Sequence, residues 1–336
     1  MELHLEELWK EAQKLKPRHA LLQIPEGLKA QATEIAGFFE GKGVTCTLLM
    51  DPCYGACDLA DDKAKTLGAD LLIHFGHSKM LHTGMRVIYW PIEYEVKKQM
   101  VQGLGNALST LKKEKGIHTF GLYAAIQFSE KLKEIAKTLE SQNLHCLVGQ
   151  GDLFEGQLLG CDVSTRKTVE EKADANVYFG DGLFHALAIA FASTKPTYLY
   201  DPFTNEFKSL EKEKETFLRQ RFALIAKAKD AKTFGIILST KRGQLRKALA
   251  LKLKALAEKH GKKALLLGMD YVKPEHVLGV KVDALVNTAC SRLATDDWLH
   301  FPKPLLTPLE LEIVLGEKDG SAYQFDEIKH YAGKVE

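Results

Sequence analysis

The sequence has 336 residues, of which 45% are hydrophobic and 27% charged, and its formal net charge is +2. This composition is typical of a globular protein of two or three domains, and the small net charge gives no electrostatic support for nucleic-acid binding. No apolar run approaches the roughly 20 residues that span a bilayer, and the charged, helix-patterned residues 1–16 do not resemble a signal peptide. We therefore expect a cytoplasmic protein, in which cysteines are more often thiols or metal ligands than disulfides.

The first third of the chain predicts a small parallel α/β unit. Short apolar segments lie at 20–24, 44–50, 70–76 and 87–91, bounded by turn residues, and a helical pattern follows the first of them. Such segments are typical of buried parallel strands that crossover helices connect.

The same order of features recurs twice, with an acidic lead-in before the third strand and a proline at the end of the fourth. The expected strands lie at 121–125, 144–149, 175–180 and 197–202 in the second block, and at 235–238, 263–268, 283–288 and 305–308 in the third. Three copies of one pattern predict three related α/β domains around a pseudo-threefold axis, each with a four-stranded parallel sheet. We place domain 1 at 1–112, domain 2 at 113–210 and domain 3 at 211–336.

The cysteines fall into two groups by position. Cys46 and Cys146 lie within second strands, where a cysteine is usually a small buried hydrophobe. Cys57, Cys161 and Cys290 follow strands, one in each domain, although the third block uses the loop after its third strand. Ligands of parallel sheets bind beyond the carboxyl ends of strands, so three such domains could bring these thiols together. Three thiolates suit an iron–sulfur cluster or zinc, but from spacing alone three unrelated thiols are the simpler interpretation.

Cys53 and Cys57 form a C-x3-C pair. The C-x3-C-x2-C motif of common radical enzymes would need a cysteine at position 60, where this chain has Ala60. Cys53 is either a redox partner of Cys57 or, as we expect, a bystander.

Polar residues also gather after the strands, on glycine-rich turns whose N–H groups could hold an anionic group. Lys241 and Arg292 could make charge-assisted bonds to a substrate carboxylate, and His185 could donate a hydrogen bond or be a core histidine. Turn or capping chemistry is the alternative for each. The sequence has no P-loop, G-x-G-x-x-G, H-E-x-x-H or nucleophile elbow, which argues against the common nucleotide-binding, protease and esterase classes.

Four motifs, considered together, are more specific. They are Tyr-Gly-Ala-Cys at 54–57 with Asp51 before it, His-Phe-Gly-His-Ser at 74–78, Gly-Asp-Gly-Leu-Phe-His at 180–185 and Thr-Ala-Cys-Ser-Arg-Leu at 288–293. As a set they resemble diphthamide synthases, the 2-(3-amino-3-carboxypropyl)histidine synthases that catalyse the first step of diphthamide formation on translation elongation factor 2. The resemblance covers nearly the whole chain, and the short length is similar to the archaeal, homodimeric form.

This resemblance implies a 4Fe–4S cluster at the domain junction, with Cys57, Cys161 and Cys290 as its ligands. The family often has proline after the third cysteine, where this chain has Ser291, but the change removes no ligand. The implied chemistry passes one electron, supplied by a donor protein, to S-adenosylmethionine, which yields methylthioadenosine and a 3-amino-3-carboxypropyl radical that adds to a histidine of the elongation factor. By location and charge, the residues expected to hold S-adenosylmethionine are Gln127, Asp181, His185, Lys241, Gln244 and Arg292.

Two other interpretations stay open. An enzyme similar to quinolinate synthase would also join three α/β units around a three-cysteine 4Fe–4S cluster, but it would use the free iron as a Lewis acid to condense small metabolites. The motifs at 54–57 and 180–185 argue against it. A non-catalytic zinc-binding or scaffold subunit is the third possibility, although three scattered cysteines without a fourth ligand make a poor closed zinc site.

Overall fold

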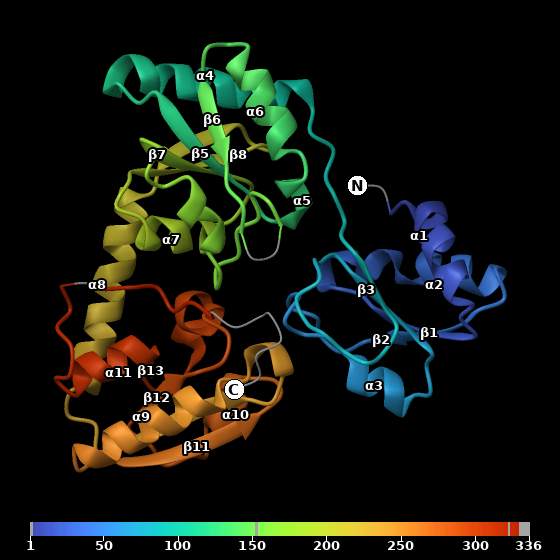
Figure 1. Cartoon of the computed structure of the whole chain (residues 1–336). Helices are drawn as coiled ribbons and strands as arrows, with labels where there is room; N and C mark the ends of the chain where they lie inside the picture. The colour runs from blue at the N-terminus through green and yellow to red at the C-terminus, as the bar shows by residue number, and fades with distance from the viewer. Residues whose placement is uncertain (1–2, 152–153, 322, 329–336) are drawn as a thin grey trace.

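The structure is a computed structural model that describes residues 3–151, 154–321 and 323–328. Within these residues the strands form two four-stranded sheets and one five-stranded sheet. In each sheet the first strand of the repeat lies between the second and the third, and the fourth follows the third. Figure 1 shows the sheets in three lobes around a central region. The predicted α/β fold of three related, mainly parallel sheets is therefore confirmed.

Domain 1 contains the sheet nearest the N-terminus. Its strands are β1 (His19–Gln23), β2 (Thr45–Leu49), β3 (Leu71–Phe75) and β4 (Val87–Trp90), and its α-helices are α1 (Leu5–Ala12), α2 (Ala32–Gly41) and α3 (Asp61–Thr66). All the strand pairs are parallel, and β3 is buried along its whole length, His74 included, as expected of a mainly apolar strand without alternation. Leu8 of α1 and Phe39 of α2 pack into the domain core with the sheet.

Domain 2 differs from the prediction by one strand. Its strands are β5 (Thr119–Tyr123), β6 (His145–Val148), β7 (Ala175–Phe179), β8 (Thr197–Asp201) and β9 (Glu206–Ser209), and its α-helices are α4 (Lys98–Lys115), α5 (Ile126–Ser129), α6 (Leu132–Glu140) and α7 (Leu183–Ala192). The expected four-stranded sheet has β9 as an antiparallel fifth strand, paired to β8. The strand was missed because it has four residues, none of them buried, and so leaves no apolar run.

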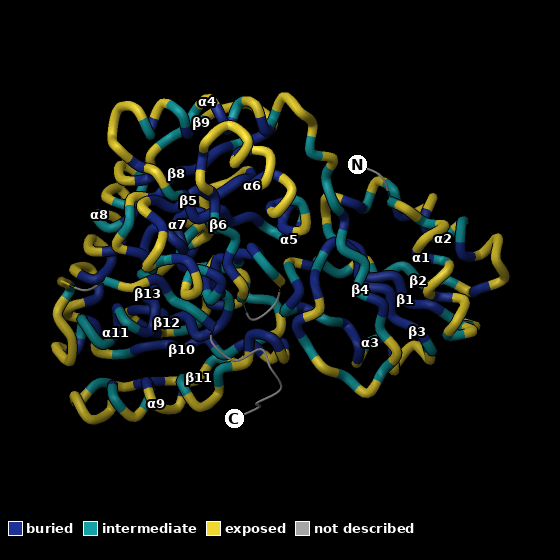
Figure 2. The backbone as a smooth tube through the Cα atoms, turned by 45° about the horizontal axis from the view of Figure 1, so that its top comes forward, coloured by how far each residue is buried: buried dark blue, intermediate teal, exposed yellow. Residues whose placement is uncertain are grey.

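Domain 3 begins with a long helix, α8, that connects it to domain 2. Its strands are β10 (Thr233–Ser239), β11 (Lys263–Met269), β12 (Ala284–Asn287) and β13 (Leu305–Leu306), and its α-helices are α8 (Glu211–Ala228), α9 (Lys247–Lys259), α10 (Pro274–Val277) and α11 (Pro308–Val314). The fourth strand is shorter than predicted because Thr307 caps α11 and Pro308 takes its first position, where a proline needs no N–H partner. Figure 2 shows buried backbone at the centre of each lobe, so the lobes have separate cores.

The proposed domain limits meet different elements. The limit at residue 112 falls inside α4, whereas α8 begins at Glu211, next to the second limit. The division into three residue ranges remains a prediction. In the described part of the chain, no helix combines the length and the apolarity that a bilayer crossing requires.

One carboxylate ties the first and third strands together in each domain. Asp70, Asp174 and Asp283 each precede a third strand and accept hydrogen bonds from two consecutive backbone N–H groups at the start of the first, at 2.8–3.2 Å. Hydrogen bonding to the charged form lowers the pKa of Asp174 and Asp283. The acidic lead-in of the repeat therefore has a structural role at the amino ends of the strands.

We expect the contribution of Asp283 to stability to depend on pH. Because its folded-state pKa is lowered, the contribution is complete above the ordinary aspartate pKa of about 4 and is lost as pH falls through the folded-state value. Asp283→Asn keeps an oxygen acceptor but removes the charge. The variant should lower the urea midpoint near neutral pH, and its difference from wild type should shrink on acidification below about pH 4. A difference that grows on acidification would contradict this assignment.

Candidate functional site

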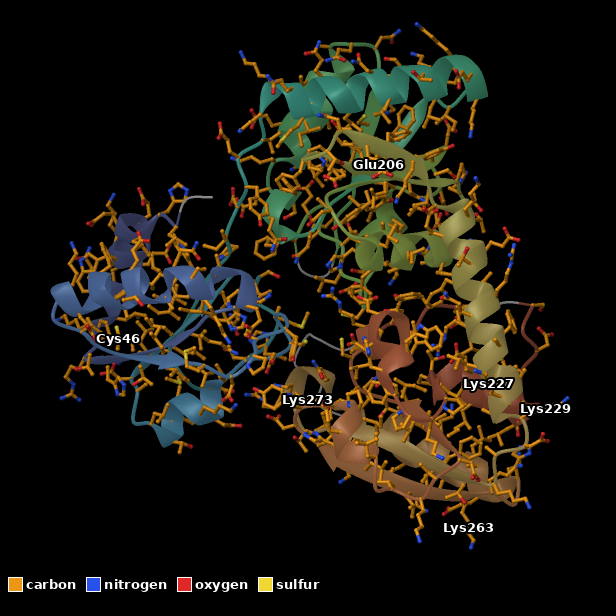
Figure 3. All side chains as sticks on the ribbon, turned by 180° about the vertical axis from the view of Figure 1, so that it is seen from behind. Cys46, Glu206, Lys227, Lys229, Lys263 and Lys273 are labelled. Atoms are coloured by element: carbon orange, nitrogen blue, oxygen red, sulfur yellow. The ribbon has the colours of Figure 1, made fainter. Side chains whose placement is uncertain are left out.

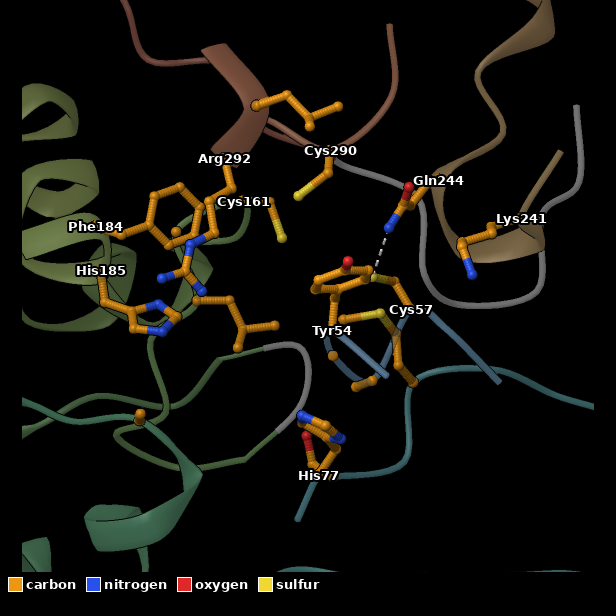
Figure 4. Close-up of a pocket in the computed structure, with 18 of the residues that line it drawn as sticks. Tyr54, Cys57, His77, Cys161, Phe184, His185, Lys241, Gln244, Cys290 and Arg292 are labelled. Carbon is orange, nitrogen blue, oxygen red and sulfur yellow. Dashed lines mark hydrogen bonds between the residues drawn. The ribbon is translucent and has the colours of Figure 1, made fainter. Parts of the chain in front are cut away.

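The three predicted ligand cysteines lie on loops that meet where the domains face one another. Cys57 follows β2, Cys161 follows β6 and Cys290 follows β12. All three line one cavity of about 330 Å³. In Figure 4 the side chains of Cys161 and Cys290 point into the space that the Cys57 loop borders. The convergence that the repeat predicted is therefore present, across three domains.

Packing and electrostatics both indicate that the thiols are neighbours. Cys57 and Cys161 pack against the same small apolar cluster, which includes Met80 and Ile328. Burial raises the pKa of Cys290 to about 12, and the nearby Cys57 adds to this rise. Burial also raises the pKa of Cys57. Thiols with raised pKa values stay protonated near neutral pH, so a bound cation is what would make them thiolates.

The spread of the sulfur atoms favours a cluster over a single ion. Among the described residues, Cys53, His74 and His77 have ligand atoms that all lie within 4.8 Å of one another. Cys57, Cys161 and Cys290 do not form such a set. Thiolates on one tetrahedral ion, each about 2.3 Å from the metal, would have to lie closer together than that. In a cluster each thiolate binds a different iron, so wider separation is required. The separation of the loop cysteines therefore argues against a single tetrahedral ion, and their three soft sulfur donors are of the kind that a 4Fe–4S cluster takes.

The compact set of Cys53 and two histidines has a simpler explanation. The Gln23 side-chain oxygen accepts from Ala60 N at 3.0 Å, so His74 Nδ1, at 2.7 Å from the same oxygen, is a donor. His74 Nε2 is then the acceptor for His77 Nδ1 at 3.2 Å. Burial lowers the pKa of His74 to about 3 and that of His77 to about 4, so both rings are neutral. The ring nitrogens of His74 are thus satisfied, and we interpret the set as a structural network beneath the Cys57 loop.

Cys53 belongs to that network by position. It is 3% exposed, and burial raises its pKa to about 12. A thiol with so little thiolate is a weak nucleophile for disulfide exchange. The role of bystander stays a prediction.

Arg246 holds the Cys290 loop and was missed by the sequence analysis. Its guanidinium donates to the carbonyl oxygens of Thr288 and Ala289, each at 2.9 Å, and pairs with both oxygens of Asp326 at 2.7 Å. Asn287, which is fully buried, donates to the carbonyl oxygen of Cys290 at 2.8 Å. Arg246 stands outside the motifs and its carboxylate partner lies 80 residues away, so no local pattern could have identified it.

The six candidates for holding S-adenosylmethionine divide between two adjoining cavities. A second cavity, of about 500 Å³, shares part of its wall with the cysteine cavity. Of these two cavities, Gln127, His185 and Arg292 line both, Asp181 lines the second, and Lys241 and Gln244 line the first. The structure brings all six to one region but gives them different partners.

Lys241 is already committed to an ion pair. Its Nζ lies 2.5 Å from Asp58 Oδ1 and 3.9 Å from the centre of the Tyr271 ring, and both charged side chains are only 8% exposed. Burial alone would lower the pKa of Lys241, but the hydrogen bond to Asp58 raises it. The ammonium group therefore serves the Cys57 loop before it could serve a substrate carboxylate.

His185 and Arg292 are better placed to meet a ligand. His185 Nδ1 is buried and has no hydrogen-bond partner among the described residues, and burial lowers the pKa of this ring to about 4. Arg292 lies over the Phe184 ring at 5.4 Å and donates to Asp296 at 2.7 Å. Phe184 packs against the Cys161 loop because position 160 is glycine, whose absent Cβ would lie 2.1 Å from the ring. An orphaned buried nitrogen beside a guanidinium is what a polar ligand would satisfy.

Comparison with known proteins gives a consistent family. The model of the diphthamide synthesis protein family matches residues 24–324. The chain is 39% identical to a 2-(3-amino-3-carboxypropyl)histidine synthase of Pyrococcus horikoshii, over 97% of this chain and 94% of that protein. It is 30% identical to subunit 1 of the human synthase of the same name, over 97% of this chain and 74% of the human protein. A crystal structure of Dph2 from Pyrococcus horikoshii with a 4Fe–4S cluster superposes with a TM-score of 0.89 at 38% identity, over 98% of this chain and 94% of the other.

Proposed function

Because the chain belongs to the diphthamide synthesis protein family and its relatives named above are transferases, we propose that it transfers the 3-amino-3-carboxypropyl group of S-adenosylmethionine to a histidine of translation elongation factor 2. This would be the first step of diphthamide biosynthesis. The observation that carries the proposal is the convergence of Cys57, Cys161 and Cys290 on one cavity, in a fold shared with a 4Fe–4S protein.

Cys57, Cys161 and Cys290 would hold the cluster. When bound, a 4Fe–4S cluster supplies the single electron that breaks a carbon–sulfur bond of S-adenosylmethionine. The protein contributes orientation and electrostatics. Which bond breaks depends on which carbon is held in line, so the side chains that fix the cosubstrate decide the product.

The two cavities suggest how the cosubstrate is oriented. The sulfonium end must face the cysteine cavity, which leaves the second cavity for the nucleoside. That cavity is lined by Tyr94, Phe128 and Tyr178, whose rings could stack on a base, and by the Asp181 carboxylate, which could accept from ribose hydroxyls. His185 and Arg292 stand on the shared wall, where they could bind the carboxylate of the methionyl part.

Product analysis tests the proposal. Purified protein, reconstituted and reduced with dithionite under anaerobic conditions, should convert S-adenosylmethionine to methylthioadenosine and modify the elongation factor. Protein that holds the cluster but forms no methylthioadenosine would contradict the proposal and favour the condensation enzyme similar to quinolinate synthase. Stoichiometric zinc without iron or sulfide would favour the scaffold subunit.

His185→Ala is expected to weaken S-adenosylmethionine binding about tenfold, because a buried hydrogen bond to a charged group is lost. The ring is neutral above its pKa of about 4, so binding should not change with pH near neutrality on account of this residue. Equilibrium binding to the reconstituted protein measures the effect, with iron content as a check on loading. His260→Ala is the control, since His260 pairs with Glu317 outside both cavities. Unchanged affinity in His185→Ala would remove this residue from the site.

The resemblance also implies partners. We propose a homodimer in the cytoplasm that receives electrons from a donor protein. Sedimentation of the reconstituted protein tests whether it is a homodimer, and a mass equal to that of one chain would reject the homodimer.

A further inference from the structure

We propose that the domain 3 loop at 239–244 clamps Cys57, and that Gln244 raises the reduction potential of the cluster through an N–H···S hydrogen bond. This inference rests on the proposed function, because it concerns the cluster that the function requires. It also changes the part predicted for Gln244, from a contact of the cosubstrate to a contact of a ligand sulfur.

The orientation of the Gln244 amide is fixed from both ends. Its Nε2 donates to Cys57 Sγ at 3.4 Å, the contact drawn as a dashed line in Figure 4. Its Oε1 accepts from the hydroxyl of Ser239 at 3.3 Å. Ser239 is fully buried and Gln244 is 6% exposed. Because a donor holds the oxygen end, the NH₂ end is the one that faces the sulfur.

The loop carrying Gln244 touches the backbone at Cys57 directly. A Cβ atom at Gly243 would lie 2.4 Å from the carbonyl oxygen of Cys57 and 2.6 Å from its Cα, so position 243 requires glycine. Lys241 in the same loop pairs with Asp58, the residue after Cys57, at 2.5 Å. One short loop of domain 3 therefore contacts both Cys57 and Asp58, and these contacts hold the Gln244 amide next to the Cys57 thiol.

The electrostatic consequence follows from the charge of the site. Reduction adds negative charge to a cluster and its thiolates, and an N–H dipole directed at a ligand sulfur stabilises the more negative state more strongly. The positive charge of Lys241, which acts on Cys57, is balanced by Asp58, whereas the Gln244 amide donates directly to the sulfur. In a buried site with low dielectric such a dipole has a large effect.

Redox titration of the reconstituted holoenzyme, followed by electron paramagnetic resonance without S-adenosylmethionine, tests the inference. Gln244→Met has a similar volume and no donor, and it should lower the ratio of reduced to oxidised cluster at a fixed potential about tenfold, equivalent to about 59 mV for one electron. Gln244→Glu adds a negative charge and should lower the ratio further. Gln157→Met is the matched control, because Gln157 lines the same cavity from domain 2 and its side-chain N–H donates to Ser78 at 3.0 Å rather than to a sulfur atom, so its substitution should leave the midpoint unchanged.

The outcomes separate this inference from the proposed function. A wild-type protein that takes up no cluster and cleaves no S-adenosylmethionine refutes the proposed function. A wild-type protein that does both, with the same midpoint in Gln244→Met, overturns only the role of Gln244. If the Gln244 variants fail to retain iron, Ser239→Ala, which frees the amide to rotate, must still lower the midpoint, and an unchanged value there overturns the inference.

Discussion

Replacing Cys57, Cys161 or Cys290 by alanine, one at a time, is expected to abolish both the bound cluster and methylthioadenosine formation. Each thiol comes from a different domain and lines the same cavity, whereas Cys53, the cysteine nearest to Cys57 in sequence, is not among the residues that line it. We therefore expect no other cysteine to replace the one removed. Activity should fall by more than about 100-fold. Replacing a residue that only hydrogen-bonds to a metal ligand already lowers metal affinity or activity by up to about 100-fold, and losing the ligand itself should have a larger effect. Iron and sulfide content and the visible spectrum of anaerobically reconstituted protein measure the effect.

Three other cysteines provide matched controls. Cys46 lies in the domain 1 sheet, as Figure 3 shows, Cys146 is 5% exposed within the domain 2 core, and Cys53 is buried beneath the Cys57 loop. Alanine at each of these positions should leave the cluster in place, with only a modest loss of stability from the buried ones. A cluster retained at full occupancy in Cys161→Ala, or lost in Cys46→Ala, would refute the ligand assignment.

Arg221→Met is expected to cost about 3–5 kcal/mol of unfolding free energy, because it leaves a buried carboxylate without its charge partner. Arg221 on α8 and Glu310 on α11 are both fully buried, and they form two hydrogen bonds at 2.5 and 2.7 Å. The same guanidinium donates to the carbonyl oxygens of Ala294 and Leu305, each at 2.7 Å. One side chain thus links the connecting helix to three segments of domain 3.

Arg219, two positions earlier on the same helix, is the control for Arg221. It pairs with Glu215 at the surface, where the two side chains are 73% and 63% exposed, so Arg219→Met should cost at most about 0.5 kcal/mol. Urea unfolding followed by circular dichroism compares the two variants. The double variant Arg221→Met with Glu310→Met should lose much less than the two single changes added together, because no charge is left unpaired. Equal losses of unfolding free energy in Arg219→Met and Arg221→Met would contradict the proposal that the burial of the Arg221–Glu310 pair causes the larger loss.

The sequence predicted those parts of the fold that leave a local trace. Buried strands such as β3 appear as short, mainly apolar segments, and the repetition of such segments predicted the three related sheets. The half-exposed β9 leaves no such run and was missed, whereas β13 was predicted but is two residues shorter than expected. After Leu306 the chain enters α11, whose first turn is capped by Thr307, Pro308 and Glu310. The strand expected from the repeat extended over the first two of these capping residues.

The candidate site shows the same division. Position after a strand separated the three cavity cysteines from Cys46 and Cys146, since strand ends meet at one edge of a sheet. It did not separate Cys57 from Cys53 in the same loop, and the choice between them came from the resemblance to a known family. Partner choice could not be predicted, because Lys241 meets Asp58 across 183 residues and Gln244 meets Cys57 across 187. Such pairs depend on how separate domains pack, which no local pattern encodes.

The three proposed ligand cysteines come from three domains that have separate cores. If Cys57, Cys161 and Cys290 hold the cluster as proposed, no fragment that lacks one of the three domains could assemble it, and such a fragment is expected to be inactive. A cluster bound in this way would also cross-link the three domains, so its loss is expected to weaken the contacts between them.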